Sequence, residues 1–337
     1  MILPESSAAV LWTLVLCLLC WGLWPNTQKA SGTRRFEMYC FDFAAGVLLT
    51  ALALAFTLGM LGNNLSFEDN LLIAGRRQMA LATAAGMVFM LAHMLLIAAV
   101  SISGLSVAFP ICFGIALSIA TLFSYLPAAS SGGAPLYSAA ALALGAAVAA
   151  AMAHISFVRS GHQDKNSQPW TKAVFLSLVS GFLMSLYLPV LNQSRQSDIG
   201  LGPYAAVACF SVGVFFSTFV YNLYFMNLPV GGRPLSMKSY IRGSIPQRLF
   251  GFVGGVLWCG GLTGYLLSIS ADPGLTPSGS FGAVLREGGP LLAGILGLLL
   301  WREFRGAKGK VRVLALAAQG LFAAAVLLLY LGLQDLG

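Results

Sequence analysis

Residues 79–102 read MALATAAGMVFMLAHMLLIAAVSI. The stretch contains no Lys, Arg, Asp or Glu. As an α-helix it is about 36 Å long, because each residue rises about 1.5 Å. The hydrocarbon core of a bilayer is about 30 Å thick and is crossed by about 20 apolar residues. The stretch therefore predicts a membrane-spanning helix, with one ionisable residue, His93, near its middle.

The composition of the whole chain agrees with a membrane location. Of its 337 residues 58% are hydrophobic and 9% are charged, and the mean hydropathy is +0.83. A soluble domain carries about 25% charged residues, so an ordinary soluble enzyme is excluded. The net charge of +8 does not indicate nucleic-acid binding, because the basic residues lie between long apolar runs.

Nine further segments meet the same length test. We predict ten spans, at residues 8–24, 41–61, 79–102, 105–126, 135–158, 173–191, 204–226, 249–269, 281–301 and 311–333. The predicted fold is an all-α integral membrane protein. The connections are too short to hold a soluble domain with an activity of its own.

The distribution of basic residues predicts how the chain is oriented. With Arg286 and Arg312, which lie near the ends of predicted spans, counted in the adjacent connections, fifteen of the 19 Lys and Arg residues lie in the odd-numbered connections and four in the even-numbered ones. By the positive-inside rule the odd connections are cytoplasmic, which places both termini outside. The expected location is a plasma membrane or a bacterial inner membrane.

Short segments recur in the same order in the two halves of the chain. Cys20-Trp-Gly-Leu-Trp-Pro25 closes the first span and Met184-Ser-Leu-Tyr-Leu-Pro189 closes the sixth. Five spans per half make the second half enter the bilayer in the opposite sense, as in transporters with inverted repeats. We predict two five-helix repeats, residues 1–160 and 161–337. The alternative is that Gly and Pro are simply frequent in membrane helices. Other matched positions are Pro110 with Pro290, Gln78 with Gln247, Gly86 with Gly255, and Ser101 with Ser270.

Four prolines lie inside or at the end of predicted spans. Proline removes one helical hydrogen bond, and in lipid the freed carbonyl needs a partner within the protein. We expect bent or broken helices around a polar interior at Pro25, Pro110, Pro189 and Pro290.

Ionisable side chains within the hydrocarbon are costly, and each is a candidate for function. His93 is a candidate for substrate or proton binding, and the alternative is an interior histidine bonded to a backbone carbonyl. Asp42 is a second candidate for proton coupling, or an interfacial carboxylate paired with Arg34 or Arg35.

The ninth predicted span carries an adjacent charged pair, Arg286 and Glu287. The two could pair with each other, but neighbours in sequence point to different helix faces, so we expect one of them to face a central cavity, and Glu287 is preferred. His154 and His162 are expected to be solvated at the cytoplasmic side.

Aromatic and amide side chains supply the rest of a site for a polar small molecule. Rings stack on planar ligands, and amides fix their orientation by paired hydrogen bonds. The candidates are Trp21, Trp24, Gln28, Tyr187, Asn192, Tyr221, Asn222 and Trp258. Trp24 also fits a residue of the interfacial aromatic belt, and Trp258 also fits core packing.

Several motifs of enzymes and pumps are missing from the sequence. It has no Walker-type glycine loop, no HExxH and no metal-ligand spacing of Cys. The six cysteines are expected to be small buried hydrophobes. We therefore expect neither an enzyme nor a cofactor or metal, and uphill transport would draw on an ion gradient.

An ordered series of motifs resembles the ureide permeases of the drug/metabolite transporter superfamily. Besides Cys20 to Pro25 with Asp42, the series comprises Ala55-Phe-Thr-Leu-Gly59, Gly104-Leu-Ser-Val107, Pro189-Val-Leu-Asn192, Gly251-Phe-Val-Gly-Gly255, Pro290 and Trp301-Arg-Glu303. The resemblance implies ten helices in two inverted halves, with the first to fourth and sixth to ninth around a central cavity. It also implies proton-coupled uptake of ureides such as allantoin and nucleobases such as uracil.

The sequence departs from this family at several positions. His93 and Trp258 replace family-like Asn, Glu287 replaces a family-like Gln, and the large central loop of plant members is reduced to residues 159–172. The compact form resembles a bacterial relative. The alternatives are a sugar transporter of the glucose or rhamnose type and a passive facilitator. Expected partners are a small-molecule substrate, H+ and membrane lipid, and a homodimer is left open. Glu303 is expected to be structural.

Overall fold

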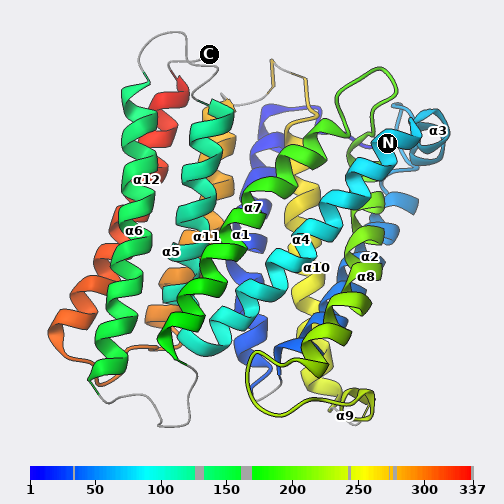
Figure 1. The fold of residues 1–337 in the computed structure, drawn as a ribbon. Coiled ribbons are helices and arrows are strands. Elements are labelled where there is room, and N and C mark those ends of the chain that lie inside the picture. The colour runs from blue at the N-terminus through cyan, green and yellow to red at the C-terminus, as the bar shows by residue number, and fades with distance from the viewer. Residues whose placement is uncertain are drawn as a thin grey trace. The chain divides into compact units, whose positions relative to one another are not determined.

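The computed structural model describes residues 1–32, 35–125, 133–160, 169–241, 244–272, 274–275 and 279–334. These residues form helices and turns, and no β-strand occurs among them (Figure 1). The elements are α1 (Ser7–Ala30), α2 (Phe36–Phe56), α3 (Phe67–Ile73), α4 (Arg76–Ser103), α5 (Leu105–Ala120) with a π-helical turn (Thr121–Tyr125), α6 (Ala134–Arg159), α7 (Trp170–Gln193), α8 (Pro203–Asn227), α9 (Met237–Ile241), α10 (Ile245–Ser268), α11 (Gly279–Leu299) and α12 (Gly309–Gln334).

Nine helices in the described part of the chain are long and apolar enough to cross a membrane. They are α1, α2, α4, α5 with its π-helical turn, α6, α7, α8, α10 and α12. The remaining predicted span, the ninth (residues 281–301), is helical up to Leu299 as α11 (Gly279–Leu299), but α11 is not one of these nine helices. The chain is an all-helical integral membrane protein.

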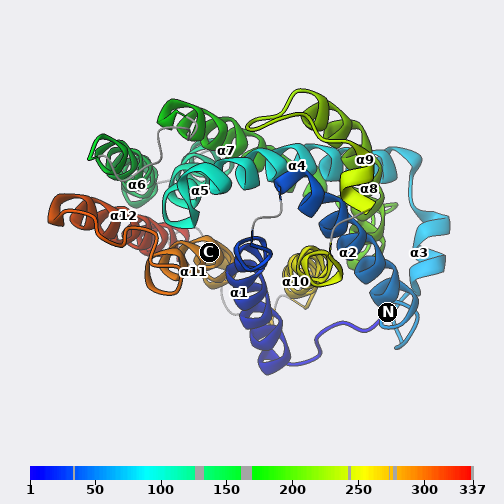
Figure 2. The same ribbon diagram turned by 90° about the horizontal axis from the view of Figure 1, so that it is seen from below.

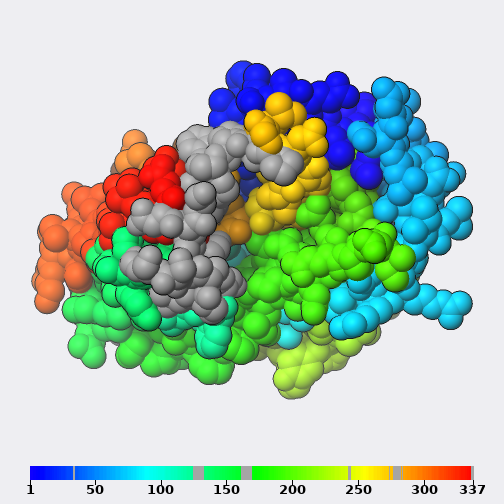
Figure 3. Space-filling model, turned by 90° about the horizontal axis from the view of Figure 1, so that it is seen from above, coloured from blue at the N-terminus to red at the C-terminus, as the bar shows by residue number. Residues whose placement is uncertain are grey.

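Two short helices, α3 and α9, lie in connections where no helix was predicted. Ser66 is the N-cap residue of α3: its hydroxyl accepts a hydrogen bond from the backbone amide of Asp69 at 3.1 Å. The segment before α3 also binds the start of the chain, because the Met1 amino group donates to the carbonyl of Asn64 at 2.9 Å. Figure 3 shows the N-terminal residues beside this segment.

The helices form two compact units. The first comprises Met1–Met94 and Leu186–Pro277, and the second comprises Leu95–Ser185 and Ser278–Gly337. The chain passes between the units within α4 and within α7. The units group residues by contact, whereas residues 1–160 and 161–337 were inferred from sequence similarity, and that division stays a prediction.

Close backbone contacts hold the first unit together. α10 packs against α1 and α2, and α2 packs against α8 (Figure 2). A Cβ atom at Gly46 of α2 would meet the carbonyl of Phe252, and one at Gly255 of α10 would meet the carbonyl of Phe43. The absence of side chains lets the two backbones touch, which is how membrane helices gain packing energy without a hydrophobic driving force.

Alanines perform the same role in the second unit. α6 packs against α12 and α5, and α11 packs against α5 and α12 (Figure 1). The face of α6 that is turned to these neighbours is buried and consists of small residues: Ala139, Ala143, Ala146, Ala150 and Ala153. Small side chains permit a close approach of the helices.

The four prolines lie inside continuous helices, so the expected helix breaks are not observed. The structure supplies a physical reason at Pro110. A proline leaves the carbonyl four residues before it without a helical donor, and here that carbonyl belongs to Ser106. Gln319 of α12 donates to it from Nε2 at 3.2 Å. The lost hydrogen bond is replaced, and α5 continues.

Glu303 stabilises the start of α5, as its expected structural role requires. The residue lies between α11 and α12, and its two carboxylate oxygens accept from the amides of Leu105 and Ser106 at 2.7 and 2.8 Å. The Ser106 hydroxyl donates a third hydrogen bond at 2.5 Å. Gly104, the N-cap, has a φ of 89° and has no Cβ that would collide with this carboxylate. The first amides of a helix lack helical partners and favour negative charge, so Glu303 acts as a cap.

Candidate functional site

His93 lies in an aromatic cluster inside the first unit. Its side chain is fully buried. The ring stacks on Phe43 of α2 at 3.9 Å between centroids and lies 4.9 Å from Trp24 of α1 and 5.5 Å from Phe89. Neither ring nitrogen has a hydrogen-bond partner. The expected alternative, a bond to a backbone carbonyl, is therefore not formed.

The second half of the cluster surrounds Trp258 of α10. The Trp258 ring stacks on Phe89 at 4.0 Å and on Phe210 of α8 at 5.5 Å. Tyr187 joins the cluster through Phe89 at 5.2 Å. Access of a ligand to the Trp258 ring thus requires displacement of Phe89 or Phe210.

The indole ring of Trp21 on α1 is hydrogen-bonded to α10. Its indole N–H donates to the carbonyl of Trp258 at 3.2 Å, and the rings of the two residues lie 6.4 Å apart. Gly261 leaves room for the Trp21 ring, since a Cβ there would overlap it. Trp24 is 3% exposed and so is not a lipid-facing belt residue in this structure.

Other buried side-chain atoms without a hydrogen-bond partner lie on helices that contribute to the aromatic cluster. They are Oε1 of Gln28 on α1, both amide atoms of Asn222 on α8 and Oδ1 of Asn192 on α7. Asn222 is fully buried, whereas its neighbour Tyr221 is half-buried. A buried polar group without a partner costs about 1–3 kcal/mol, so these atoms mark places where a ligand or water can bind.

Asp42 is not paired with Arg35. Its Oδ1 accepts a hydrogen bond from the hydroxyl of Tyr240 at 2.8 Å, and Arg35 forms its ion pair with Glu37 at 2.5 Å. Arg35 and Glu37 are only two positions apart where α2 begins, so the guanidinium reaches the nearer carboxylate. Arg34 lies outside the described residues.

Arg286 and Glu287 form an ion pair with each other, the arrangement that the sequence left possible but did not favour. The distance from the guanidinium to Oε1 of Glu287 is 2.7 Å, and each side chain is 12% exposed. Both side chains are long enough to curve around the helix, and pairing offsets the cost of placing two charges in a poorly solvated site. The pair belongs to the second unit.

His154 is buried, so the expectation that it is solvated is wrong. It is 3% exposed, and its Nε2 has no hydrogen-bond partner. α6 continues to Arg159, which keeps His154 within the helix. His162 lies outside the described residues. The cysteines match expectation, since all six are free and none but Cys209 is even partly exposed.

The sequence did not single out Phe43, Phe89 and Phe210, which complete the cluster. Phenylalanine is common in membrane helices, so the residues alone gave no reason to select these three. In the described segments no three His, Cys, Asp or Glu side chains are grouped as a metal site.

Comparisons with known proteins bear on the class of protein and on its fold. The chain is 25% identical to "Ureide permease 4" of Arabidopsis thaliana over 400 aligned positions, which cover 98% of each protein. A solved structure described as "Crystal structure of protein" has the same fold at a TM-score of 0.52 and 14% identity, covering 96% of this chain and 100% of the other. No protein-family model matches the chain. The chain is an integral membrane protein that is similar along its whole length to a permease, a transport protein and not an enzyme.

Proposed function

We propose that the protein is a secondary transporter of small, planar, polar solutes, with ureides and nucleobases as the substrate class. The observation that carries this proposal is His93, a fully buried imidazole whose two nitrogens lack partners inside a membrane-spanning helix. A protein retains such a group at a cost unless something else binds it. The permease similarity supports the same class.

The surroundings of His93 suit a flat ligand with N–H and C=O groups. The rings of Trp24 and Phe43 lie next to His93 and can flank a planar molecule. A neutral imidazole offers one donor and one acceptor, and the amides of Gln28 and Asn222 offer more. In this proposal Trp21, Tyr187, Asn192, Tyr221 and Trp258 complete the binding region of the first unit. Glu287, a further candidate from the sequence, belongs to the second unit.

The packing of the first unit supports the proposed inverted repeat. A Cβ at Gly86 of α4 would meet the carbonyl of Phe210 on α8, and one at Gly213 of α8 would meet that of Thr83 on α4. Gly255 of α10 and Gly46 of α2 make the same kind of contact, in which each glycine lies against a backbone carbonyl of the other helix. A shift of five spans relates α4 to α10 and α2 to α8, so the two contacts occupy equivalent places in the two proposed repeats. Related contacts of this kind fit alternating access.

Ligand-dependent thermal stability tests the substrate class. We expect allantoin or uracil at about 100 times its Kd to stabilise the purified protein by about 2.7 kcal/mol. His93→Leu should lose this response while the ligand-free protein stays as stable, because an apolar group replaces an unpartnered polar one. His93→Asn should keep part of the response. His154→Leu, which removes a second buried imidazole, is the matched control and should respond like the wild type.

Two outcomes would contradict the proposal. Stabilisation by glucose or rhamnose, without any by ureides or nucleobases, would favour the sugar transporter. Uptake into proteoliposomes that never exceeds the external concentration, whatever gradient is applied, would indicate a passive facilitator.

Proton coupling is proposed for Glu287, with Asp42 and His93 as further candidates. A carboxylate that is paired with Arg286 in one state and protonated in another would couple its charge to the transport cycle. We expect Glu287→Gln to keep substrate exchange but to lose accumulation driven by a pH gradient. Asp42→Asn, which keeps an acceptor for Tyr240, should have a smaller effect. Uphill uptake by Glu287→Gln with the pH dependence of the wild type would remove Glu287 from the mechanism.

A further inference from the structure

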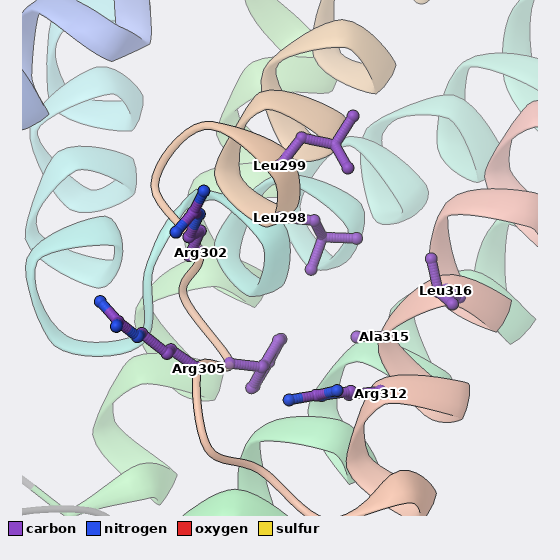
Figure 4. Close-up of a pocket in the computed structure, with 8 residues that line it drawn as sticks. Leu298, Leu299, Arg302, Arg305, Arg312, Ala315 and Leu316 are labelled. Atoms are coloured by element: carbon purple, nitrogen blue, oxygen red, sulfur yellow. The ribbon is translucent and has the colours of Figure 1, made fainter.

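A pocket of about 290 Å³ lies in the second unit, where α11 ends and α12 begins. Its lining combines two kinds of side chain (Figure 4). Three are arginines: Arg302 and Arg305 from the connecting loop and Arg312 from α12. The other five are apolar: Leu298, Leu299, Phe304, Ala315 and Leu316.

The three arginines are available to an external anion. All three are exposed, and none of their guanidinium groups has a hydrogen bond or an ion pair with any described residue. The acidic side chain within this loop, Glu303, is already engaged by the amides of Leu105 and Ser106. The loop still carries a net positive charge, because its basic side chains outnumber this one carboxylate. Lys308 and Lys310 are also exposed and add to this charge.

The apolar part of the lining continues onto surfaces that a membrane covers. Leu299 is 70% exposed and Leu316 is 62% exposed. Leu316 lies on α12, one of the helices suited to span the bilayer. A soluble anion such as phosphate has no apolar part to cover these leucines. An anionic phospholipid has both parts, since its phosphate suits guanidinium groups and its acyl chains suit leucine side chains.

We propose that this pocket, lined by Arg302, Arg305 and Arg312 with Leu298, Leu299 and Leu316, binds one anionic phospholipid. Figure 4 shows Arg312 directed toward the loop, whereas Arg302 and Arg305 extend from the loop away from Arg312. In the proposal these two exposed side chains turn toward the headgroup phosphate beside Arg312, and the acyl chains follow the leucines of α11 and α12. The inference does not depend on the transported substrate, because its residues are not those of the proposed substrate site. The bound lipid also holds the loop that presents Glu303 to α5, so it should stabilise the folded protein.

The test compares lipids added to the delipidated protein in detergent. Phosphatidylglycerol should raise the melting temperature, and phosphatidylcholine and inorganic phosphate should not. Native mass spectrometry should show one tightly retained phosphatidylglycerol. In the Arg302→Gln/Arg305→Gln/Arg312→Gln variant its apparent affinity should fall by about a hundredfold, since each basic residue near an anionic lipid contributes to binding.

A matched variant separates this site from general charge effects. Arg76→Gln/Arg77→Gln/Arg159→Gln removes the same number of exposed arginines away from the pocket and should keep the wild-type response. Equal losses in the two triple variants would overturn the proposal. Equal stabilisation by phosphatidylcholine would also overturn it, and stabilisation by phosphate alone would indicate a soluble-anion site. A variant that fails to fold is replaced by the triple Arg→Lys variant, which retains the charge and should bind phosphatidylglycerol more weakly but selectively.

Discussion

Replacing Glu303 by Ala should lower the free energy of unfolding by roughly 3 kcal/mol or more. The substitution removes three hydrogen bonds at the start of α5, and hydrogen bonds to a charged group contribute about 1.5–3 kcal/mol each without being additive. It also leaves the amides of Leu105 and Ser106 without an acceptor at a helix terminus. Thermal unfolding of the detergent-solubilised protein should show a clear loss of stability.

A graded set of variants identifies the cause. Ser106→Ala removes the hydroxyl and keeps the two bonds to backbone amides, so about 1 kcal/mol should be lost. Glu303→Gln keeps one acceptor oxygen but places an NH2 group near backbone donors, and its stability should lie between those of the other two variants. Glu68→Gln changes an exposed carboxylate on α3 and should behave as the wild type. Unchanged stability of Glu303→Ala would mean that α5 does not depend on this cap.

Replacing Gly255 by Val should cost about 3 kcal/mol and should greatly reduce the yield of folded protein. A Cβ there would overlap the Phe43 carbonyl and crowd the Val47 amide, which are backbone atoms of α2. Backbone atoms cannot change rotamer, so α2 and α10 would have to separate. Overpacking typically costs about 1–3 kcal/mol, and the second branch of valine adds to it. Size-exclusion profiles and thermal unfolding measure both effects.

Gly320→Val provides the control for this prediction. Gly320 lies in α12, is exposed and has open space around the position of its Cβ. The variant carries the same change in helix propensity and should fold with nearly normal stability. If the two variants lost stability equally, backbone propensity rather than helix packing would explain the effect at Gly255.

The sequence was a good guide to the helices and a poor guide to the side-chain partners. Nine predicted spans correspond to helices that can cross a membrane, while α3 and α9 were missed because they are too short to show a clear apolar pattern. The assignment of Glu303 to a structural role is confirmed by its cap on α5. The expectation of a solvated His154 was wrong. Among the described residues Asp42 binds Tyr240 and not Arg35, and of the two arrangements considered for Arg286 and Glu287 the ion pair is the one observed. Each of these three concerned where a flexible side chain ends, which spacing along one helix does not decide.

The sequence alone determined that this chain resides in a membrane as a set of helices. Long uncharged runs satisfy their backbone hydrogen bonds in lipid only as helices, and that requirement acts locally. Tertiary structure alone decided that His93 lies among Trp24, Phe43 and Phe89 without a polar partner. It also decided that Gln319 replaces the hydrogen bond lost at Pro110. Those contacts join residues that are distant in the chain, and they depend on which helix faces meet when the helices pack.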